Sequence, residues 1–546
     1  MNPHEPQPDK RLAQGQSQAW RAIFATDHKS VGARFLWLAL FCVVLGMALS
    51  LAMRIHLSRE DAGLPGTGVP GQQYQAMMLV HGSLMVFFVL TAAPQCGFGY
   101  FLLPLQIGAR EMAFPRLSGI SLGMTLVSLG GIMISFASKP GTGMTVWLFS
   151  VTCFCAAMVV ASLNICVTAI DCRAKGMTLP RLPVTVWAWL VTAILSLLIF
   201  SVLLASSVLL LADRFAETQF FHLRSAAVLA RPFLWQRWFW FFAQAEVYVA
   251  MLPCFGIVTH VLAIYSRRKL WGERAAVLGL CGVGLFGFCI WGEHLFASGL
   301  DPYTPLVFSM LASSLGIPAV LLVFCWIRTL WGGKLRLDTA MLFALGFIAL
   351  FLSGGISGIF MARRTSAGLG MNEELLAGHF HLVMGVAATF AILAALFFWF
   401  PKIFGRRLNE TLGKIHFWAT LAGVYALFLP MHWLGLLERE NVLAGAGSLG
   451  HGLRMTVMVA TAVTVSAQIL FFWNLFWSLW RGESAGSKNP WRATTLEWFV
   501  DSPPPRENFG SGAPVVFRGA YEFGVALAGE DFVPQHLTPE RVAKLQ

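Results

Sequence analysis

Long apolar runs alternate with short polar segments along almost the whole chain. Twelve runs reach about twenty residues or more, the length at which an α-helix spans the roughly 30 Å hydrocarbon core of a bilayer. They lie near 34–53, 75–104, 117–138, 144–170, 184–212, 233–265, 275–299, 304–331, 339–362, 375–401, 412–436 and 455–480. The pattern predicts an all-α integral membrane protein with twelve transmembrane helices. Its parts are an N-terminal segment at 1–33, a membrane domain at 34–480 and an extramembrane extension at 481–546.

The basic residues between the runs indicate how the helices are oriented. If the N-terminus is cytoplasmic, the even-numbered loops contain Arg173, Lys175, Arg181, Arg267, Arg268, Lys269, Arg274, Lys334, Arg336, Lys402, Arg406 and Arg407. The loop around Asp301, on the opposite side, has no basic residue. Because cytoplasmic loops carry an excess of Lys and Arg, both termini are predicted to be cytoplasmic.

Composition excludes a soluble enzyme. The chain is 57% hydrophobic and 12% charged, whereas about a quarter of the residues in a soluble protein are charged. The net charge of +12 comes from short loops rather than one long basic surface, so nucleic acid is not expected as a partner. The ten cysteines have no paired spacing, and no C-x-x-C-H motif is present. Any c-type haem or dinuclear copper centre must therefore belong to a partner subunit.

Four histidines are candidates for mid-helix depth, where a polar side chain is costly. These are His81, His294, His379 and His381. A single such histidine is more often a satisfied core residue than a ligand. The last two are different, because residues two apart on a helix point about 200° apart. They cannot both bind one metal, but they can bind two planar cofactors on opposite sides of the helix, which indicates two haems. His28, His260, His416 and His432 are expected to be helix-end or packing groups.

Several further stretches carry a family pattern. They are Thr26-Asp27-His28-Lys29, Cys96-Gly97-Phe98-Gly99 through Met112-Ala113-Phe114-Pro115-Arg116, Glu246-Val247-Tyr248, Leu345-Gly346-Phe347, His379-Phe380-His381, Asn489-Pro490-Trp491 and Ala493-Thr494-Thr495-Leu496-Glu497-Trp498. With them the chain resembles subunit I of the haem-copper oxygen reductases, the cytochrome c oxidase type, over nearly its whole length. The resemblance implies that family's twelve-helix arrangement. It also implies that His81 and His381 are axial ligands of a low-spin haem and that His379 is the proximal ligand of a high-spin haem.

The family's copper ligands are altered in this chain. The resemblance leads us to expect one histidine in the sixth helix and a His-His pair in the seventh, but the matching residues are Gln244, Glu293 and His294. Copper favours imidazole and softer donors, while a carboxylate and a carbonyl oxygen with one imidazole suit a harder ion such as ferrous iron. We therefore expect non-haem iron rather than copper facing the high-spin haem. The alternative is that the site has lost its metal.

Proton and radical chemistry is altered as well. Tyr248 follows Gln244 by four residues and so lies on the same helix face, but the His-Tyr crosslink of the family cannot form on a glutamine. The lysine that the family has after Ile-Pro in the eighth helix is replaced by Leu322. Of the other proton path, Glu246 remains in mid-membrane, with Glu111 as a substitute acid at its entrance. Proton pumping is therefore not expected.

Haem anchoring also departs from the family. Of the Arg pair that contacts haem propionates after the eleventh helix, only Arg439 is kept, within Leu437-Glu438-Arg439-Glu440. The His-Asp pair that precedes the tenth helix aligns with Met371-Asn372. The structural magnesium site that the pair supports in the family is therefore in question here.

These departures favour nitric oxide reduction, in which two NO, two electrons and two protons give N2O and water. In this interpretation Glu293, Tyr248 and Glu246 are the catalytic candidates.

The expected cofactors are two haems, of a or b type, and a non-haem iron. The partners are the gas NO (with O2 as the other candidate), membrane lipids and an electron-donor subunit carrying a dinuclear copper or c-type haem. The resemblance places the protein in a bacterial inner membrane. A terminal oxygen reductase with a modified metal site and a non-catalytic haem protein for electron transfer or gas sensing are the alternatives.

Overall fold

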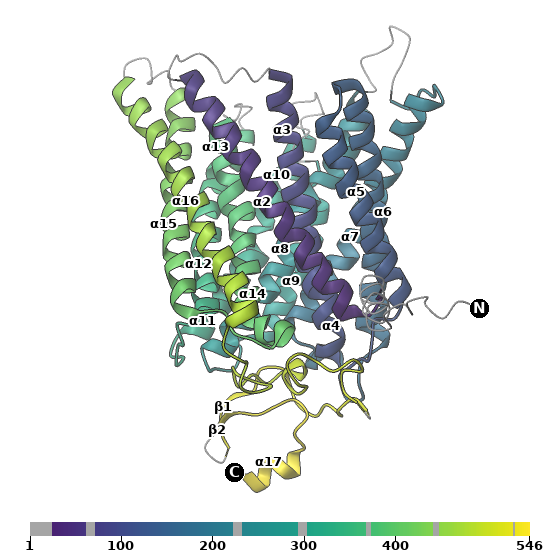
Figure 1. Cartoon of the computed structure of the whole chain (residues 1–546), viewed down its shortest axis with the longest axis vertical. Coiled ribbons are helices and arrows are strands. Elements are labelled where there is room, and N and C mark those ends of the chain that lie inside the picture. The colour runs from purple at the N-terminus through teal and green to yellow at the C-terminus, as the bar shows by residue number, and fades with distance from the viewer. Residues whose placement is uncertain are drawn as a thin grey trace, which may run out of the picture.

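A tall bundle of helices makes up most of the molecule (Figure 1). The structure is a computed structural model that describes residues 25–61, 71–221, 232–292, 303–366, 373–439, 447–510, 512–527 and 530–545. The bundle consists of α2 (His28–Asp61), α3 (Gly71–Ser83), π-helical η1 (Leu84–Phe98), α4 (Gly99–Ile107), α5 (Pro115–Ala137), α6 (Pro140–Asp171), α7 (Val184–Phe215), α8 (Pro232–Tyr265), α9 (Glu273–Cys289), α10 (Tyr303–Ser314), α11 (Gly316–Leu330), α12 (Thr339–Ser366), α13 (Glu373–Phe380), π-helical η5 (His381–Gly385), α14 (Val386–Phe404), α15 (Glu410–Arg439) and α16 (Gly447–Arg481).

The predicted membrane helices are present wherever the structure describes the chain. Eleven helices in the described ranges are long and apolar enough to cross a membrane. The one remaining predicted span, at 275–299, is the seventh in chain order. It overlaps α9, and its last part falls in the segment 293–302, which lies outside the described residues. The all-α membrane fold is therefore confirmed.

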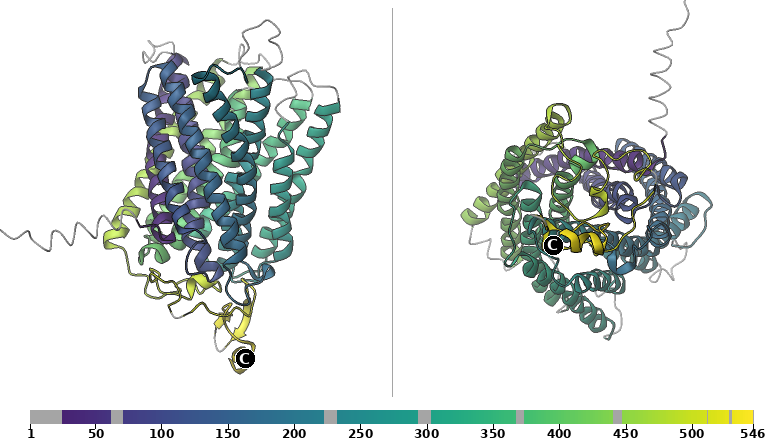
Figure 2. Two further views of the ribbon diagram at one scale, coloured as in Figure 1. Left: turned by 90° about the vertical axis from the view of Figure 1, so that its right-hand side faces the viewer. Right: turned by 90° about the horizontal axis from the view of Figure 1, so that it is seen from below.

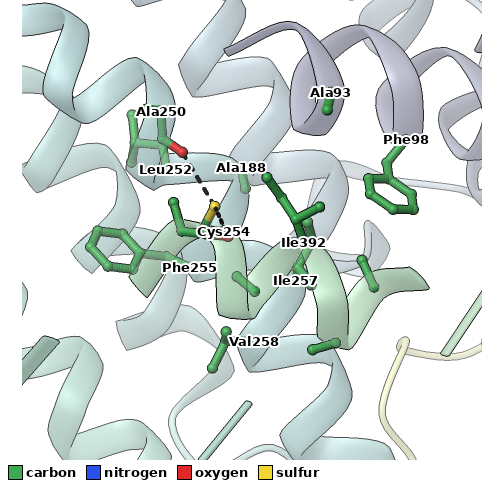
Figure 3. Close-up of a cluster of buried hydrophobic side chains, with 14 of the residues drawn as sticks. Ala93, Phe98, Ala188, Ala250, Leu252, Cys254, Phe255, Ile257, Val258 and Ile392 are labelled. Atoms are coloured by element: carbon green, nitrogen blue, oxygen red, sulfur yellow. Dashed lines mark hydrogen bonds between the residues drawn. The ribbon is translucent and has the colours of Figure 1, made fainter. Parts of the chain in front are cut away.

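Close helix contacts in the bundle depend on small residues, as is usual where lipid supplies no hydrophobic driving force between helices. Gly32 of α2 lies against η1 and α4, where a Cβ would come within 2.7 Å of the Gly97 carbonyl oxygen. In the centre, α8 packs against α7 and α14 through small and branched side chains (Figure 3). Cys254 belongs to this core, and its thiol contacts the Ala250 carbonyl oxygen of its own helix (3.3 Å). All ten cysteines are free thiols, so a disulfide framework is absent as predicted.

The C-terminal extension covers the base of the bundle (Figure 2, right). It contains the 3-10 turn η7 (Leu496–Trp498), the antiparallel strands β1 (Phe523–Leu527) and β2 (Glu530–Phe532), and α17 (Pro539–Leu545). The ammonium group of Lys402 in α14 donates a hydrogen bond to the Val500 carbonyl oxygen (2.7 Å). This extramembrane segment is therefore bound to the membrane domain as a cap.

Two histidines join the cap to the helices. His28 Nε2 lies 3.2 Å from Asn508 Oδ1, so the start of α2 and the extension share one end of the bundle. His260 of α8 lies between Tyr521 (Nδ1 to Oη, 3.0 Å) and Glu497 (Nε2 to Oε1, 3.5 Å). Burial by itself raises the pKa of Glu497, but hydrogen bonds from His260 and Gln106 outweigh burial and hold that pKa below its usual range. Both histidines are packing groups, as the sequence indicated.

Asn508 provides a test of how firmly the cap is held. Its amide contacts His28, accepts a hydrogen bond from Lys29 (2.8 Å) and donates one to the Ala109 carbonyl oxygen (3.0 Å). Asn508→Ala would leave these buried groups unpaired, so we expect a loss of about 1–3 kcal/mol in the free energy of unfolding. Thermal denaturation and the rate of tryptic cleavage within the extension measure the effect. Glu507→Ala, at the exposed neighbouring position, is the control and should change neither.

Candidate haem and metal site

His81 lies in the last turn of α3 and is oriented by α2. Its Nδ1 donates a hydrogen bond to the carbonyl oxygen of Gly46 (2.9 Å). Gly46 also leaves room for Met85, because a Cβ there would lie 2.5 Å from the Met85 sulfur. The imidazole is therefore fixed by backbone on one side, between two helices.

His379 and His381 diverge from the α13–η5 junction toward different neighbours. His379 Nδ1 lies 3.1 Å from the carbonyl oxygen of Gly354 in α12. His381 Nδ1 donates to the Ala377 carbonyl oxygen (2.7 Å), and its ring stacks on Phe428 of α15 with ring centroids 4.8 Å apart. The divergence expected from their spacing is present.

The three imidazoles are suited to binding haem iron. A carbonyl oxygen can only accept a hydrogen bond, so Nδ1 of His81 and of His381 carries the proton and, in a neutral ring, Nε2 has a free lone pair. His379 Nδ1 also lies 3.0 Å from the Ser357 hydroxyl, which donates to the Gly354 carbonyl oxygen (2.8 Å) and so offers an acceptor to a proton on Nδ1. In the described part of the chain, no hydrogen bond reaches Nε2 of His81, His379 or His381. Orientation of a ligating histidine by a backbone carbonyl at its other nitrogen is usual in metal sites.

Two π-helical segments adjoin these histidines, and the apolar pattern did not reveal them. η1 begins three residues after His81, and η5 begins at His381. π-helical turns occur mostly as local insertions at functional sites. Pro94 within η1 is the one sequence signal, because proline removes a backbone donor from the helix. The carbonyl oxygen of Pro94 accepts a hydrogen bond from the indole of Trp189 in α7 (2.9 Å).

Gln244 and Tyr248 lie on α8, which faces the end of α9. The ring of Tyr248 lies against Gly287, where it would overlap any Cβ. Phe241 makes edge-to-face contact with Phe288 (5.3 Å) and lies 5.9 Å from Trp291, measured between ring centroids. This part of α8 therefore lies beside residues 287–291, which lie just before Glu293 in the sequence.

Glu246 points to a different neighbour from Tyr248. Its side chain is buried, and Oε1 accepts a hydrogen bond of 2.5 Å from the Thr91 hydroxyl of η1. Oε2 has no hydrogen-bond partner in the described residues. The acid is therefore held between α8 and η1, on the side of α8 that does not face α9. Thr91 was not identified from the sequence.

Other candidate residues fall outside what the structure describes. Glu293, His294 and the Met371-Asn372 pair lie in undescribed segments, and α15 ends at Arg439, whose side chain is not described. Accordingly, no cluster of three or more His, Cys, Asp or Glu side chains is found within the described ranges. The third-metal site thus stays a prediction.

The positions of the family's two proton paths differ in their surroundings. Leu322 is fully buried, and near it the indole of Trp326 donates to the Thr259 hydroxyl (2.8 Å), so apolar groups occupy the position of the family's lysine. At the base, Glu111 Oε1 accepts from the backbone N–H groups of His28 (2.8 Å) and Met112 (3.0 Å). Burial raises the pKa of Glu111, which makes this carboxyl easier to protonate at the end of α4.

An ion pair near His381 was also missed. Arg54 of α2 lies 3.7 Å from Glu374 of α13 (Nη1 to Oε1) and donates to the sulfur of Met431 (2.9 Å). Its charge acts on His381.

A helical bundle with three imidazoles that make no hydrogen bond at Nε2 in the described residues is an arrangement that can bind haem iron. The family described as "Cytochrome C and Quinol oxidase polypeptide I" matches residues 30–442. The chain is 36% identical over 570 residues to alternative cytochrome c oxidase subunit 1 of Bradyrhizobium diazoefficiens, covering 97% of this chain and 95% of the relative. It is 33% identical to cytochrome c oxidase subunit 1 of Synechocystis, covering 92% of each chain. The chain belongs to this family, the catalytic subunit I of the haem-copper oxidoreductases.

A solved structure shows the same fold. A haem-copper terminal oxidase dimer determined by cryo-electron microscopy superposes with a TM-score of 0.68 over 84% of each chain. Its sequence identity to this chain is 16%, so the likeness concerns the helix arrangement alone.

Exchange of His381 separates the two predicted haems. We expect His381→Ala to abolish the low-spin haem spectrum and to leave the high-spin spectrum, because His379 lies on the other side of the helix. Optical and electron paramagnetic resonance spectra of the purified complex measure both. His416→Ala is the control: it removes another buried histidine, which contacts Gln468 instead (3.0 Å), and should leave both spectra unchanged. Loss of both spectra in a folded His381→Ala protein would contradict the assignment.

Proposed function

We propose that this chain is the catalytic subunit of a membrane nitric oxide reductase, which converts two NO, two electrons and two protons to N2O and water. The observation that carries the proposal is the loss of two of the three copper-binding histidines, at Gln244 and Glu293, while all three predicted haem ligands are kept. Bound at these residues, a low-spin haem supplies electrons, and a high-spin haem paired with a non-haem iron binds the two NO molecules.

The three haem-directed histidines have complementary tasks. His81 and His381 would hold the low-spin haem between α3 and η5, and His379 would hold the high-spin haem from the α12 side. Their Nδ1 hydrogen bonds to Gly46, Ala377 and Gly354 fix the ring orientations. The two iron sites then flank one short helical junction, which supports fast electron transfer between them.

The third metal would be held by Glu293 and His294, with Gln244 as a weaker ligand or as a hydrogen-bond partner of a bound water. A buried carboxylate without a counter-ion is costly, and a divalent cation offsets that cost. Oxygen and imidazole donors together suit ferrous iron better than copper. Tyr248, beside Gly287 of α9, would supply a hydroxyl hydrogen bond close to this group.

Proton supply agrees with a two-proton reaction. Glu246, bound through one oxygen to Thr91, keeps Oε2 without a partner in the described residues and can take up and release a proton there. The apolar surroundings of Leu322 and the Trp326–Thr259 hydrogen bond leave no titratable group at the family's lysine position. Reduction of two NO needs two protons and no O–O cleavage, so one path is sufficient.

Oxygen reduction is the second candidate, and the names of the relatives favour it, since both are called cytochrome c oxidase subunit 1. The metal content separates the candidates. An iron beyond the haem irons supports NO reduction, copper supports oxygen reduction, and neither metal supports a non-catalytic haem protein.

Glu293→Ala tests the third metal. We expect a loss of most of the non-haem iron and a fall of about tenfold or more in NO turnover. Loss of a residue that only hydrogen-bonds to a metal ligand already lowers metal affinity by about 10–100-fold, and loss of a ligand should cost at least as much. Iron analysis against haem content measures the metal directly. Glu273→Ala, at the opposite end of the same predicted helix, removes a carboxylate and should leave the iron in place. A full complement of iron in Glu293→Ala would sink the assignment.

Turnover of the natural protein tests the reaction. With a suitable electron donor we expect NO to be consumed to N2O faster than O2 is consumed, without proton translocation. The double variant Gln244→His with Glu293→His restores imidazole donors and should shift the bound metal toward copper and depress NO turnover. Rapid O2 reduction by the natural protein, with copper bound and no N2O formed, would refute the proposal.

A further inference from the structure

A crevice opens between α3, α6, α7 and α8, at the end of the bundle opposite the C-terminal cap. It has a volume of about 680 Å³, within the range of small-molecule sites. Its walls are apolar and include Leu79, Leu148, Leu210 and Phe239. Asp213 and Arg214, from the last turn of α7, stand at one end of it. The lining is therefore that of a site for an amphiphile, with a long apolar part and a charged end.

Two tryptophans of the lining are held in place by neighbours outside the crevice. The indole of Trp147 donates to the hydroxyl of Ser83 (3.0 Å), which donates in turn to the Leu79 carbonyl oxygen (2.8 Å). Trp235 packs edge-to-face on Phe221, with ring centroids 5.8 Å apart. The walls are thus pre-organised, so an occupant needs to order few side chains on binding.

The charged end carries one carboxylate and one guanidinium, which differ in their partners. The Asp213 carboxylate accepts hydrogen bonds from the Thr218 hydroxyl (2.6 Å) and from the backbone N–H groups of Phe220 and Phe221 (2.8 Å each). Arg214 is exposed and donates one hydrogen bond, to the carbonyl oxygen of Gly141 (2.8 Å). That bond fixes the guanidinium beside the crevice, and a guanidinium has five N–H donors. Donors and charge remain for an anionic group.

We propose that this crevice binds one anionic glycerophospholipid, with its phosphate on Arg214 and one acyl chain along Leu79, Leu148 and Phe239. The guanidinium fork matches a phosphate, whereas an uncharged quinol head would gain no ion pair there. Arg214 and Gly141 lie at the ends of membrane-spanning α7 and α6, which is the depth of lipid headgroups. The site is independent of the reaction catalysed and of the metals bound.

Retention of lipid by the purified complex tests the proposal. After exchange into detergent with phosphatidylglycerol as the only lipid, native mass spectrometry should find one phosphatidylglycerol per chain. Leu210→Trp fills the crevice and should lower the occupancy at least fivefold. Leu198→Trp adds the same bulk to α7 at an exposed position outside the crevice lining and should retain the lipid.

The charge is tested separately. Arg214→Gln should lower phosphatidylglycerol occupancy at least threefold, whereas Lys139→Gln, at an exposed cation of the same end that is not in the lining, should not. Haem content and melting temperature identify any variant that fails to fold. Equal retention by Leu210→Trp and the natural protein would overturn the site, and equal retention by Arg214→Gln would overturn the phosphate contact. Recovery of a quinone instead of phosphatidylglycerol from the natural protein would also overturn the proposal.

Discussion

Hydrocarbon offers no hydrogen bonds, so every polar group carried into the membrane must find its partner within the protein. Helices satisfy the backbone, and many buried polar side chains are hydrogen-bonded to carbonyl oxygens or to one another, whereas Glu246 Oε2 has no partner in the described residues. The Nδ1 atoms of His81, His379 and His381 all obey this rule. The same constraint that satisfies one ring nitrogen leaves the other available, and the candidate haem site follows from that asymmetry.

The bundle separates its chemical tasks by helix face. On α8, Tyr248 is directed to α9, and Glu246 is directed to Thr91 of η1. A group that can carry protons is therefore held apart from the groups proposed for the third metal, although only one residue separates it from Gln244 in the sequence. Such a separation allows a proton to approach from one side of α8 while the gas is bound on the other.

The base of the bundle is organised by a different chemistry. Lys29 and Lys402 donate hydrogen bonds to backbone carbonyl oxygens of the extension, and His260 lies between Tyr521 and Glu497. Because α8 carries both His260 at its base and Gln244 higher up, the cap also fixes the position of the helix on which the candidate metal site is built.

The sequence by itself determined the membrane helices, because a run of about twenty apolar residues matches the thickness of the hydrocarbon core as an α-helix. It also indicated that His379 and His381 point apart, because a 200° divergence follows from the helical repeat alone, while the family resemblance pointed to His81 and to the ligand role of each. Only the tertiary structure decided which neighbours those rings meet: Gly46, Gly354 and Phe428 come from three other helices. Thr91 beside Glu246, Arg54 beside Glu374 and the π-helical turns were likewise invisible to the apolar pattern. These features depend on how helices far apart in sequence cross, and periodicity within one helix does not specify its partner.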